Sequence, residues 1–200
     1  MPRRSAPRTP RHTARAPHEV RIIGGQWRRT RLPVADQPGL RPTPDRVRET
    51  LFNWLGQDLS GWRCVDAFAG TGALGFEAAS RGAADVLLVE QDAALIATLR
   101  ALKERLTADT VRVQRGDGVA ALRALAPGSV DLVLLDPPFE APELFAPALA
   151  AAARAVQPQG FVYLEAPAAW HAAALADHGL APHRHLHAGA VHAHLLRPSA

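Results

Sequence analysis

Four consecutive residues, Asp136-Pro137-Pro138-Phe139, combine groups that could hold and orient an amine. Two successive prolines fix the backbone φ angle twice and remove two N–H donors. The acceptors that remain are the Asp136 carboxylate and the neighbouring backbone carbonyls, and Phe139 adds an aromatic face. This set suits an exocyclic amine on a planar base, so we take the four residues as the candidate catalytic group. The alternative is a proline-rich turn that only ends a strand.

A glycine-rich segment, Asp66-Ala-Phe-Ala-Gly-Thr-Gly-Ala-Leu-Gly75, supplies the second chemical signal. Gly70, Gly72 and Gly75 fit the G-x-G-x-x-G pattern, in which glycines let the backbone approach a ligand and let the following helix pack closely. Because the segment follows a strand-like run and precedes a helical pattern, it predicts a nucleotide-type cofactor. A tight structural turn is the competing interpretation.

Two acidic residues stand at the ends of further strand-like runs. Glu90 ends the second run, where a carboxylate can accept hydrogen bonds from both ribose hydroxyls of NAD or, equally, of S-adenosylmethionine. Asp117, between Gly116 and Gly118, follows the third run, where an acid could lie near an adenine amine. The respective alternatives are a solvated strand-end acid and a turn-forming aspartate.

The elements that must position these residues alternate between strand and helix. Strand-like runs cover 63–68, 85–90, 110–115, 130–136 and 160–165, and helical patterns cover 73–81, 92–107, 118–126 and 142–156. Short apolar runs separated by helices predict βαβ units and a buried parallel sheet, which binds ligands at the carboxyl ends of its strands. Runs at 181–187 and 190–196, joined at Gly189, predict a hairpin. The sequence therefore predicts an α/β fold with a seven-stranded, mostly parallel sheet whose last strand is antiparallel.

The segment before this sheet divides into three parts. Residues 1–17 are rich in arginine and proline without an apolar run, which predicts a disordered tail. Residues 19–35 read as a β-hairpin with turn freedom at Gly24 and Gly25. The expected domains are this tail, a hairpin-and-helix appendage over 18–60, and the α/β domain over 61–200.

A helix is predicted over 43–56. Thr43 can cap it, and Pro44 suits its first position. Val47 and Leu51 begin an apolar stripe that leaves Arg46, Arg48 and Glu49 outside it.

Charge is unevenly distributed along the chain. The net charge is +4, yet residues 1–60 hold 12 arginines against 5 acids, a net of +7, and residues 61–200 hold 11 basic against 14 acidic residues, a net of −3. A basic front on a mildly acidic body predicts an anion-binding appendage, with nucleic acid as the leading partner.

Composition excludes several classes of protein. The single cysteine, Cys64, can form neither an internal disulfide nor a cysteine-based zinc site, which favours a reducing, cytoplasmic setting. A run of about 18 apolar residues, as a transmembrane helix needs, is not found, and neither is a secretory signal. His183, His185 and His187 alternate, so they are expected on one strand face; a solvated edge is favoured over a metal site there.

The motifs together resemble a known family. The segments 21–27 (RIIGGQW) and 41–55 (RPTPDRVRETLFNWL), with Asp136–Phe139, are similar to the RsmD-type methyltransferases of bacteria, and the resemblance runs from about residue 20 to 197. It implies a Rossmann-like class I methyltransferase fold and S-adenosylmethionine as cofactor. It also implies methylation of N2 of a guanine, named for guanine 966, in 16S rRNA of the 30S subunit or its assembly intermediate. A monomer without metal or membrane partner is expected.

The resemblance also implies roles for individual residues. The catalytic residues would be Asp136, Pro137, Pro138 and Phe139. The cofactor-binding residues would be Asp66, Phe68, Gly70, Thr71, Gly72, Glu90, Gln91, Asp117 and Gly118, with Arg41 and Thr43 closing over the cofactor. The RNA-binding residues would be Arg21, Trp27, Arg28, Arg29, Arg31, Arg46 and Arg48, which could hold phosphates and stack on a base.

Other functions remain open at this point. An amino-group methyltransferase acting on DNA adenine N6 or on a protein glutamine is the closest alternative, although Asp rather than Asn at position 136 and the 41–55 segment speak against it. An NAD-dependent oxidoreductase fits the glycine segment but does not need Asp136–Phe139. A ribosome-assembly RNA binder without turnover would not need Asp66, Glu90 and Asp136.

Overall fold

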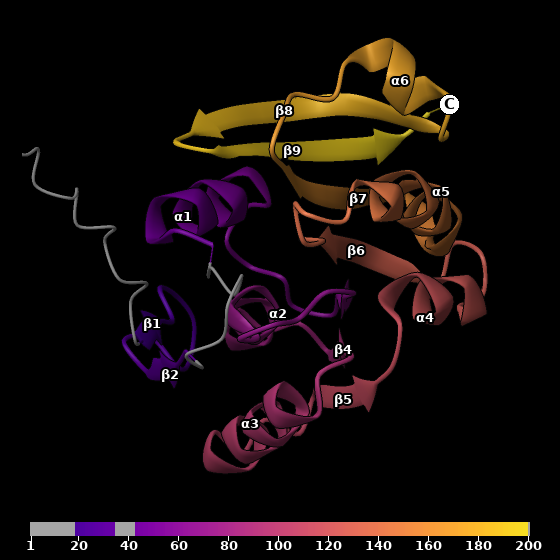
Figure 1. Cartoon of the computed structure of the whole chain (residues 1–200). Helices are drawn as coiled ribbons and strands as arrows, with labels where there is room; N and C mark the ends of the chain where they lie inside the picture. The colour runs from indigo at the N-terminus through magenta and orange to yellow at the C-terminus, as the bar shows by residue number, and fades with distance from the viewer. Residues whose placement is uncertain (1–18, 35–42, 200) are drawn as a thin grey trace, which may run out of the picture.

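Seven strands form one mixed sheet at the centre of the protein, in a computed structural model that describes residues 19–34 and 43–199 (Figure 1). The strand order is β5-β4-β3-β6-β7-β9-β8. The strands are β3 (Arg63–Asp66), β4 (Asp85–Glu90), β5 (Val111–Arg115), β6 (Val130–Leu135), β7 (Val156–Ala166), β8 (Leu180–Ala188) and β9 (Val191–Pro198). The first five are parallel, and β9 pairs antiparallel with both β7 and β8. The predicted seven-stranded sheet with an antiparallel last strand is therefore confirmed.

Helices cover both faces of this sheet. One face carries α1 (Asp45–Trp54), α2 (Ala73–Ser80) and α3 (Ala93–Arg105), whose apolar side chains join a first core cluster with β3, β4 and β6. The other face carries α4 (Gly118–Ala124), α5 (Phe145–Ala155) and α6 (Ala172–Ala176), which contribute to a second core cluster. A 3-10 turn, η1 (Pro142–Leu144), leads into α5. Because helices cover both faces of the sheet, side chains on both faces of its central strands are apolar. The sequences of these strands are therefore continuous apolar runs and do not alternate between apolar and polar residues.

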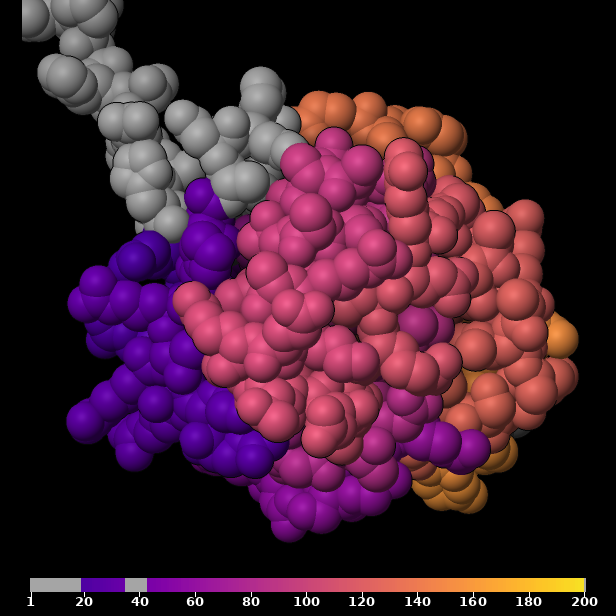
Figure 2. All heavy atoms as spheres, turned by 90° about the horizontal axis from the view of Figure 1, so that it is seen from below, coloured from indigo at the N-terminus to yellow at the C-terminus, as the bar shows by residue number. Residues whose placement is uncertain are grey.

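The N-terminal segment packs onto the first face. β1 (Glu19–Arg21) pairs antiparallel with β2 (Arg31–Pro33), as the predicted hairpin requires. Ile22 and Leu32 are completely buried in the same core cluster as Val47 and Phe52 of α1. In Figure 2 the indigo hairpin lies beside the pink atoms of α3, where the Arg105 Nη2 donates to the Arg31 carbonyl at 2.7 Å. The hairpin and α1 thus share the sheet's core, while the proposed domain boundaries stay a prediction.

The structure differs from the predicted elements in several places. β7 begins at Val156 rather than at 160, and β3 ends at Asp66, where the glycine segment leaves the sheet. α6 was not predicted because it is one short alanine-rich turn. Pro44 precedes α1 and no described side chain caps that helix, so the predicted Thr43 cap is wrong. The tail over 1–17 lies outside the described residues.

Among the described residues, none of the helices is both long and apolar enough to cross a membrane.

Candidate active site at the carboxyl edge of the sheet

The acidic residues singled out in the sequence gather where four adjacent parallel strands end. Asp66 ends β3, Glu90 ends β4 and Asp136 follows β6. Asp66 pairs in register with Leu88 of β4 and with Leu134 of β6, so these three strands end within two residues of one another. We call this end of the sheet the carboxyl edge, the position at which open α/β sheets bind ligands.

The glycine segment wraps tightly over this edge. Gly72 adopts a left-handed backbone conformation with φ +77°, which residues other than glycine rarely adopt. A Cβ atom at Gly75 would lie 2.1 Å from Leu88 Cδ2, so glycine is needed for α2 to pack against β4. The neighbouring Phe68 is half-buried against the second core cluster, and Thr71 is buried with its Oγ1 accepting from the Ala73 N–H. The segment therefore makes the tight turn and the close helix packing that its glycines predict, and we call it the cradle.

Asp66 is a buried carboxylate with one oxygen unsatisfied. Its Oδ2 accepts from the Gly75 N–H at 3.0 Å, whereas its Oδ1 has no hydrogen-bond partner among the described residues. Burial, and to a lesser extent the nearby Glu90 carboxylate, raise the pKa of Asp66 to about 7 against the lowering effect of the Gly75 N–H. A cationic amine is the ligand that would satisfy such an oxygen and keep the carboxylate ionised.

Glu90 ties the glycine segment to the end of β4. Its two oxygens accept three backbone N–H groups, from Gly70 at 2.9 Å, Gln91 at 2.7 Å and Asp92 at 2.9 Å. A carboxylate offers about four acceptor sites. Since the three N–H groups use three of them, Glu90 keeps one site for a ligand hydroxyl.

Asp117 forms a turn and helix cap, as the alternative to an adenine contact expects. It caps α4 by accepting from the Ala120 N–H at 2.7 Å, and it also accepts from the exposed Gln91 side chain at 3.3 Å. A Cβ atom at Gly118 would lie 2.0 Å from the Ala67 carbonyl oxygen, so glycine brings this turn against the loop after β3. The predicted cofactor residues of both loops are thus neighbours.

The Asp136–Phe139 segment extends β6 past the edge. Pro137 is buried and Pro138 exposed, and the Pro138 carbonyl accepts from the Ala141 N–H at 3.0 Å, which closes the turn. Phe139 is half-buried against the second core cluster. Burial, and then the carboxylates of Glu165 and Asp66, raise the pKa of Asp136 well above its usual value.

Glu165, near the end of β7, belongs to the same acidic group but was not predicted. It is buried, and it accepts a hydrogen bond from the Tyr163 hydroxyl at 2.9 Å and another from the Thr43 side chain. Thr43 is therefore turned toward the carboxyl edge, which explains why it does not cap α1. A usable signal was present, since Glu165 ends a predicted strand parallel to the one before Asp136.

Arg48 corrects one predicted RNA contact. Its side chain has 0% exposure, and its Nη1 lies 3.5 Å from the fully buried Glu77 Oε2. Its Nη2 lies 2.6 Å from Asp45 Oδ1 and donates to the Arg21 carbonyl at 2.9 Å. Since its guanidinium is fully buried and bonded to Glu77, Asp45 and the Arg21 carbonyl, Arg48 holds the hairpin, α1 and α2 together and is not available to a phosphate.

The other predicted RNA-binding residues lie on or near the surface. The exposed arginines of this set are Arg21, Arg28, Arg29, Arg31 and Arg46. Arg31 pairs with Glu19 at 2.9 Å. Trp27 is half-buried, with its ring edge-on to Phe76 at 6.5 Å. Arg41 lies outside the described residues.

The C-terminal histidines do not share one face as predicted. A bulge between Pro182 and Arg184 places the His183 ring 5.6 Å from Phe161. His185 instead stacks on His192, with ring centroids 5.3 Å apart. Within the described residues, groups of three or more His, Cys, Asp or Glu side chains able to hold a metal ion are not found.

The family model described as "Conserved hypothetical protein 95" matches residues 20–197, nearly the whole described chain. The chain belongs to the RsmD-type methyltransferase family. Its fold is the class I methyltransferase fold of that family, with the same seven-stranded sheet.

Curated relatives agree with this family. The chain is 50% identical over 121 residues to "Ribosomal RNA small subunit methyltransferase D" of Escherichia coli strain K12, an alignment that covers 60% of this chain and 61% of the relative. It is 42% identical over 130 residues to the protein of the same name from Haemophilus influenzae, covering 64% and 67%. The alignment thus spans less than two thirds of the first relative's length.

Solved structures agree over a longer range. An Escherichia coli protein described as a putative methyltransferase superposes with a TM-score of 0.76 at 34% identity, covering 90% of this chain and 98% of that one. A Haemophilus influenzae protein superposes with a TM-score of 0.74 at 30% identity, covering 91% and 99%. The family's architecture therefore extends over almost all of the described residues.

Proposed function

We propose that this protein transfers a methyl group from S-adenosylmethionine to the exocyclic N2 of a guanine in 16S rRNA, of the guanine 966 type, in the 30S subunit or its assembly intermediate. The observation that carries the proposal is the placement of Asp136 at the carboxyl edge beside the unsatisfied carboxylate of Asp66. The Asp136 carboxylate could accept from an amine, and Asp66 offers a buried oxygen without a described partner to a cation. With rRNA as acceptor, the expected compartment is the bacterial cytoplasm and the expected form a monomer.

The residues at this edge fit the proposed cofactor. Asp66 Oδ1 would receive its ammonium group, since this oxygen is buried and has no described partner. The cradle of Phe68, Gly70, Thr71 and Gly72 would lie along it, and Thr43 and Arg41 would close over it. Glu90 would accept from its ribose, and Gln91, Asp117 and Gly118 would border the adenine. When bound, S-adenosylmethionine supplies a methyl group already activated by the positive charge on sulfur.

The chain's own residues would then prepare the amine. Guanine N2 is a weak nucleophile because its lone pair is delocalised into the ring. Hydrogen bonds from its N–H groups to Asp136 and to a carbonyl near Pro137 localise that pair and orient it, and in-line positioning can contribute several kcal/mol. Asp136 stabilises the positive charge that develops on nitrogen. Phe139 stacks on the base, which must leave its own stack to enter.

The exposed arginines would hold the RNA backbone. Arg21, Arg28, Arg29, Arg31 and Arg46 surround the N-terminal hairpin and the start of α1. Phosphate contacts make RNA affinity fall steeply with rising salt concentration.

The acceptor is tested by offering four substrates side by side. Radiolabelled S-adenosylmethionine is incubated with the protein and 30S particles, naked 16S rRNA, duplex DNA or total protein. The proposal expects label in 30S particles or 16S rRNA. Label confined to DNA or to protein would support the alternative amino-group acceptors instead.

Removing the Glu90 carboxylate is expected to weaken S-adenosylmethionine binding. Glu90→Ala loses the proposed ribose contact and the three N–H bonds that hold the glycine segment, so the Kd should rise at least about tenfold. Isothermal titration measures the change, with the exposed Glu104→Ala on α3 as the matched control. Equal affinities for both variants would remove Glu90 from the cofactor site.

The methyl-transfer rate is expected to depend on the ionisation of Asp136. Its raised pKa means that activity is present above this pKa and is lost as the pH falls through it, at a pH well above the usual aspartate range. Because the Glu165 charge contributes to the shift, Glu165→Gln should move the midpoint of a single-turnover pH profile to lower pH. A midpoint that Glu165→Gln leaves in place would show that another group controls the profile.

A further inference from the structure

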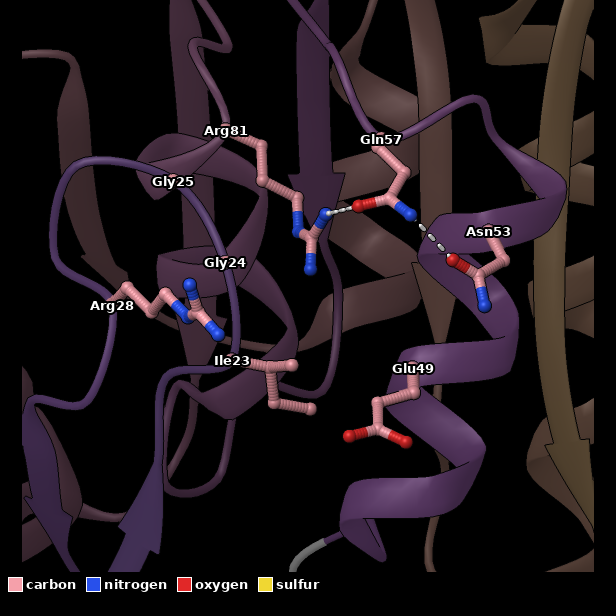
Figure 3. A pocket seen from close by; sticks show the side chains of 8 residues that line it. All are labelled: Ile23, Gly24, Gly25, Arg28, Glu49, Asn53, Gln57 and Arg81. Carbon is pink, nitrogen blue, oxygen red and sulfur yellow. Dashed lines mark hydrogen bonds between the residues drawn. The ribbon is translucent and has the colours of Figure 1, made fainter.

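A pocket of about 480 Å³ opens between the 23–28 loop, α1 and the end of α2, away from the carboxyl edge (Figure 3). The helix α2 starts beside the carboxyl edge and runs away from it. Arg81, at the far end of this helix, therefore lies toward the amino ends of the parallel strands. The residues that line the pocket are distinct from those proposed to bind the cofactor or the reacting amine. The pocket is therefore a separate feature of the N-terminal part.

One wall of the pocket is held in place by buried contacts. Arg81 is 8% exposed, and its guanidinium donates from Nε to Glu77 Oε1 at 2.9 Å and lies 4.7 Å from the centre of the Phe52 ring. Its Nη1 donates to Gln57 Oε1 at 3.2 Å, and Gln57 Nε2 donates to Asn53 Oδ1 at 2.7 Å (Figure 3). The guanidinium is thus held by buried partners, and the two exposed amides continue the wall from it.

The opposite sides of the opening carry two opposite charges. Arg28 projects from the 23–28 loop and Glu49 from α1, and Figure 3 shows both heads directed into the space between them. Both are exposed, and neither makes an ion pair within residues 19–34 and 43–199, unlike Arg31 with Glu19. The Arg28 guanidinium and the Glu49 carboxylate lie on opposite sides of the pocket. They fit a ligand that presents hydrogen-bond acceptors on one edge and hydrogen-bond donors on another.

Guanine has this distribution of groups. Its O6 and N7 accept from a guanidinium, the commonest arginine–base contact. Its N1–H and N2–H2 groups lie side by side and can donate to the two oxygens of one carboxylate. Adenine and cytosine each offer a carboxylate a single amino group, and uracil a single N–H. The other exposed arginines of the hairpin and α1, which are Arg21, Arg29, Arg31 and Arg46, favour a base in a nucleic acid over a free amino acid.

We propose that this pocket binds a guanine of the substrate RNA other than the methyl acceptor, with Glu49 contacting N1–H and N2–H2 and Arg28 contacting O6 and N7. The inference rests on the proposed function for its RNA partner. Base contacts specify sequence, whereas phosphate contacts position the partner. The pocket would therefore let the N-terminal part select its target.

The test measures binding of mononucleotides to the full chain. GMP, IMP, AMP and UMP are titrated and followed by NMR chemical shifts. GMP should bind most tightly, and IMP, which lacks the 2-amino group, more weakly. Glu49→Gln and Arg28→Gln should each weaken GMP binding about tenfold, because each loses a charged hydrogen-bonding partner. The exposed Glu104→Gln and Arg123→Gln make the same changes of charge elsewhere and should leave GMP binding unchanged.

A variant of the carboxyl edge separates this pocket from the methyl-transfer site. Asp136→Ala should bind GMP like the wild type if the pocket is the site. The inference is overturned if Asp136→Ala loses GMP while Glu49→Gln keeps it, if AMP or a free amino acid binds as tightly as GMP, or if GMP does not bind up to its solubility limit. Failure of the proposed function would appear separately, as wild-type protein that methylates no RNA.

Discussion

Replacing Asp136 with alanine is expected to lower the methyl-transfer rate about 100- to 1,000-fold, the effect of removing one acceptor or donor aligned with a developing charge. The carboxylate is the only acidic side chain in the Asp136–Phe139 turn, and the two prolines cannot replace it. S-adenosylmethionine affinity should stay near the wild-type value, because the proposed cofactor contacts come from the loops after β3, β4 and β5. Single-turnover kinetics and isothermal titration measure the two quantities.

Two controls make this result specific. Asp136→Asn keeps the size of the side chain and one acceptor oxygen, so it should retain more activity than alanine but less than the wild type. Glu140→Ala removes an exposed acid four residues away and should behave as wild type. A near-wild-type rate for Asp136→Ala would exclude the proposed role of this residue.

Replacing Arg48 with alanine is expected to lower the free energy of unfolding by about 3–5 kcal/mol, the usual cost of breaking a buried ion pair. The substitution leaves the buried Glu77 with Arg81 as its only cationic partner among the described residues. It also removes donors from the carbonyls of Arg21 and Thr43, so the hairpin and the start of α1 lose their shared contact. Denaturation in urea measures the loss.

The exposed Arg46, two residues earlier on α1, is the matched control for charge. Arg46→Ala should change the free energy of unfolding by no more than about 0.5 kcal/mol and should weaken RNA binding instead. If Arg48→Ala were as stable as Arg46→Ala and lost RNA affinity, Arg48 would be a phosphate contact after all.

The sequence predicted the sheet well because its signals are local. Apolar runs and intervening helical patterns located five parallel strands, and Gly189 located the final hairpin. The strand-end positions of Asp66, Glu90 and Asp136 followed directly, because parallel strands end at a common edge. The tight packing at Gly75 follows from the G-x-G-x-x-G pattern.

What the sequence could not predict depends on tertiary contacts. Arg48 lies outside the apolar stripe of α1, yet it is buried because Glu77 of α2 provides a partner that only folding brings near. The alternation rule failed for His183 because a bulge shifts the register of β8. The end of a predicted strand marked Glu165, but its proximity to the Tyr163 hydroxyl and to Asp136 arises only on folding.

The identity of the methylated nucleoside tests the proposed function most directly. 30S particles or 16S rRNA are treated with the protein and S-adenosylmethionine, digested to nucleosides and analysed by mass spectrometry, with Asp136→Ala in parallel. We expect N2-methylguanosine with the wild type and only background with the variant. Methylation at a different position, such as N6 of adenine, or equal amounts of N2-methylguanosine from both proteins would contradict the account.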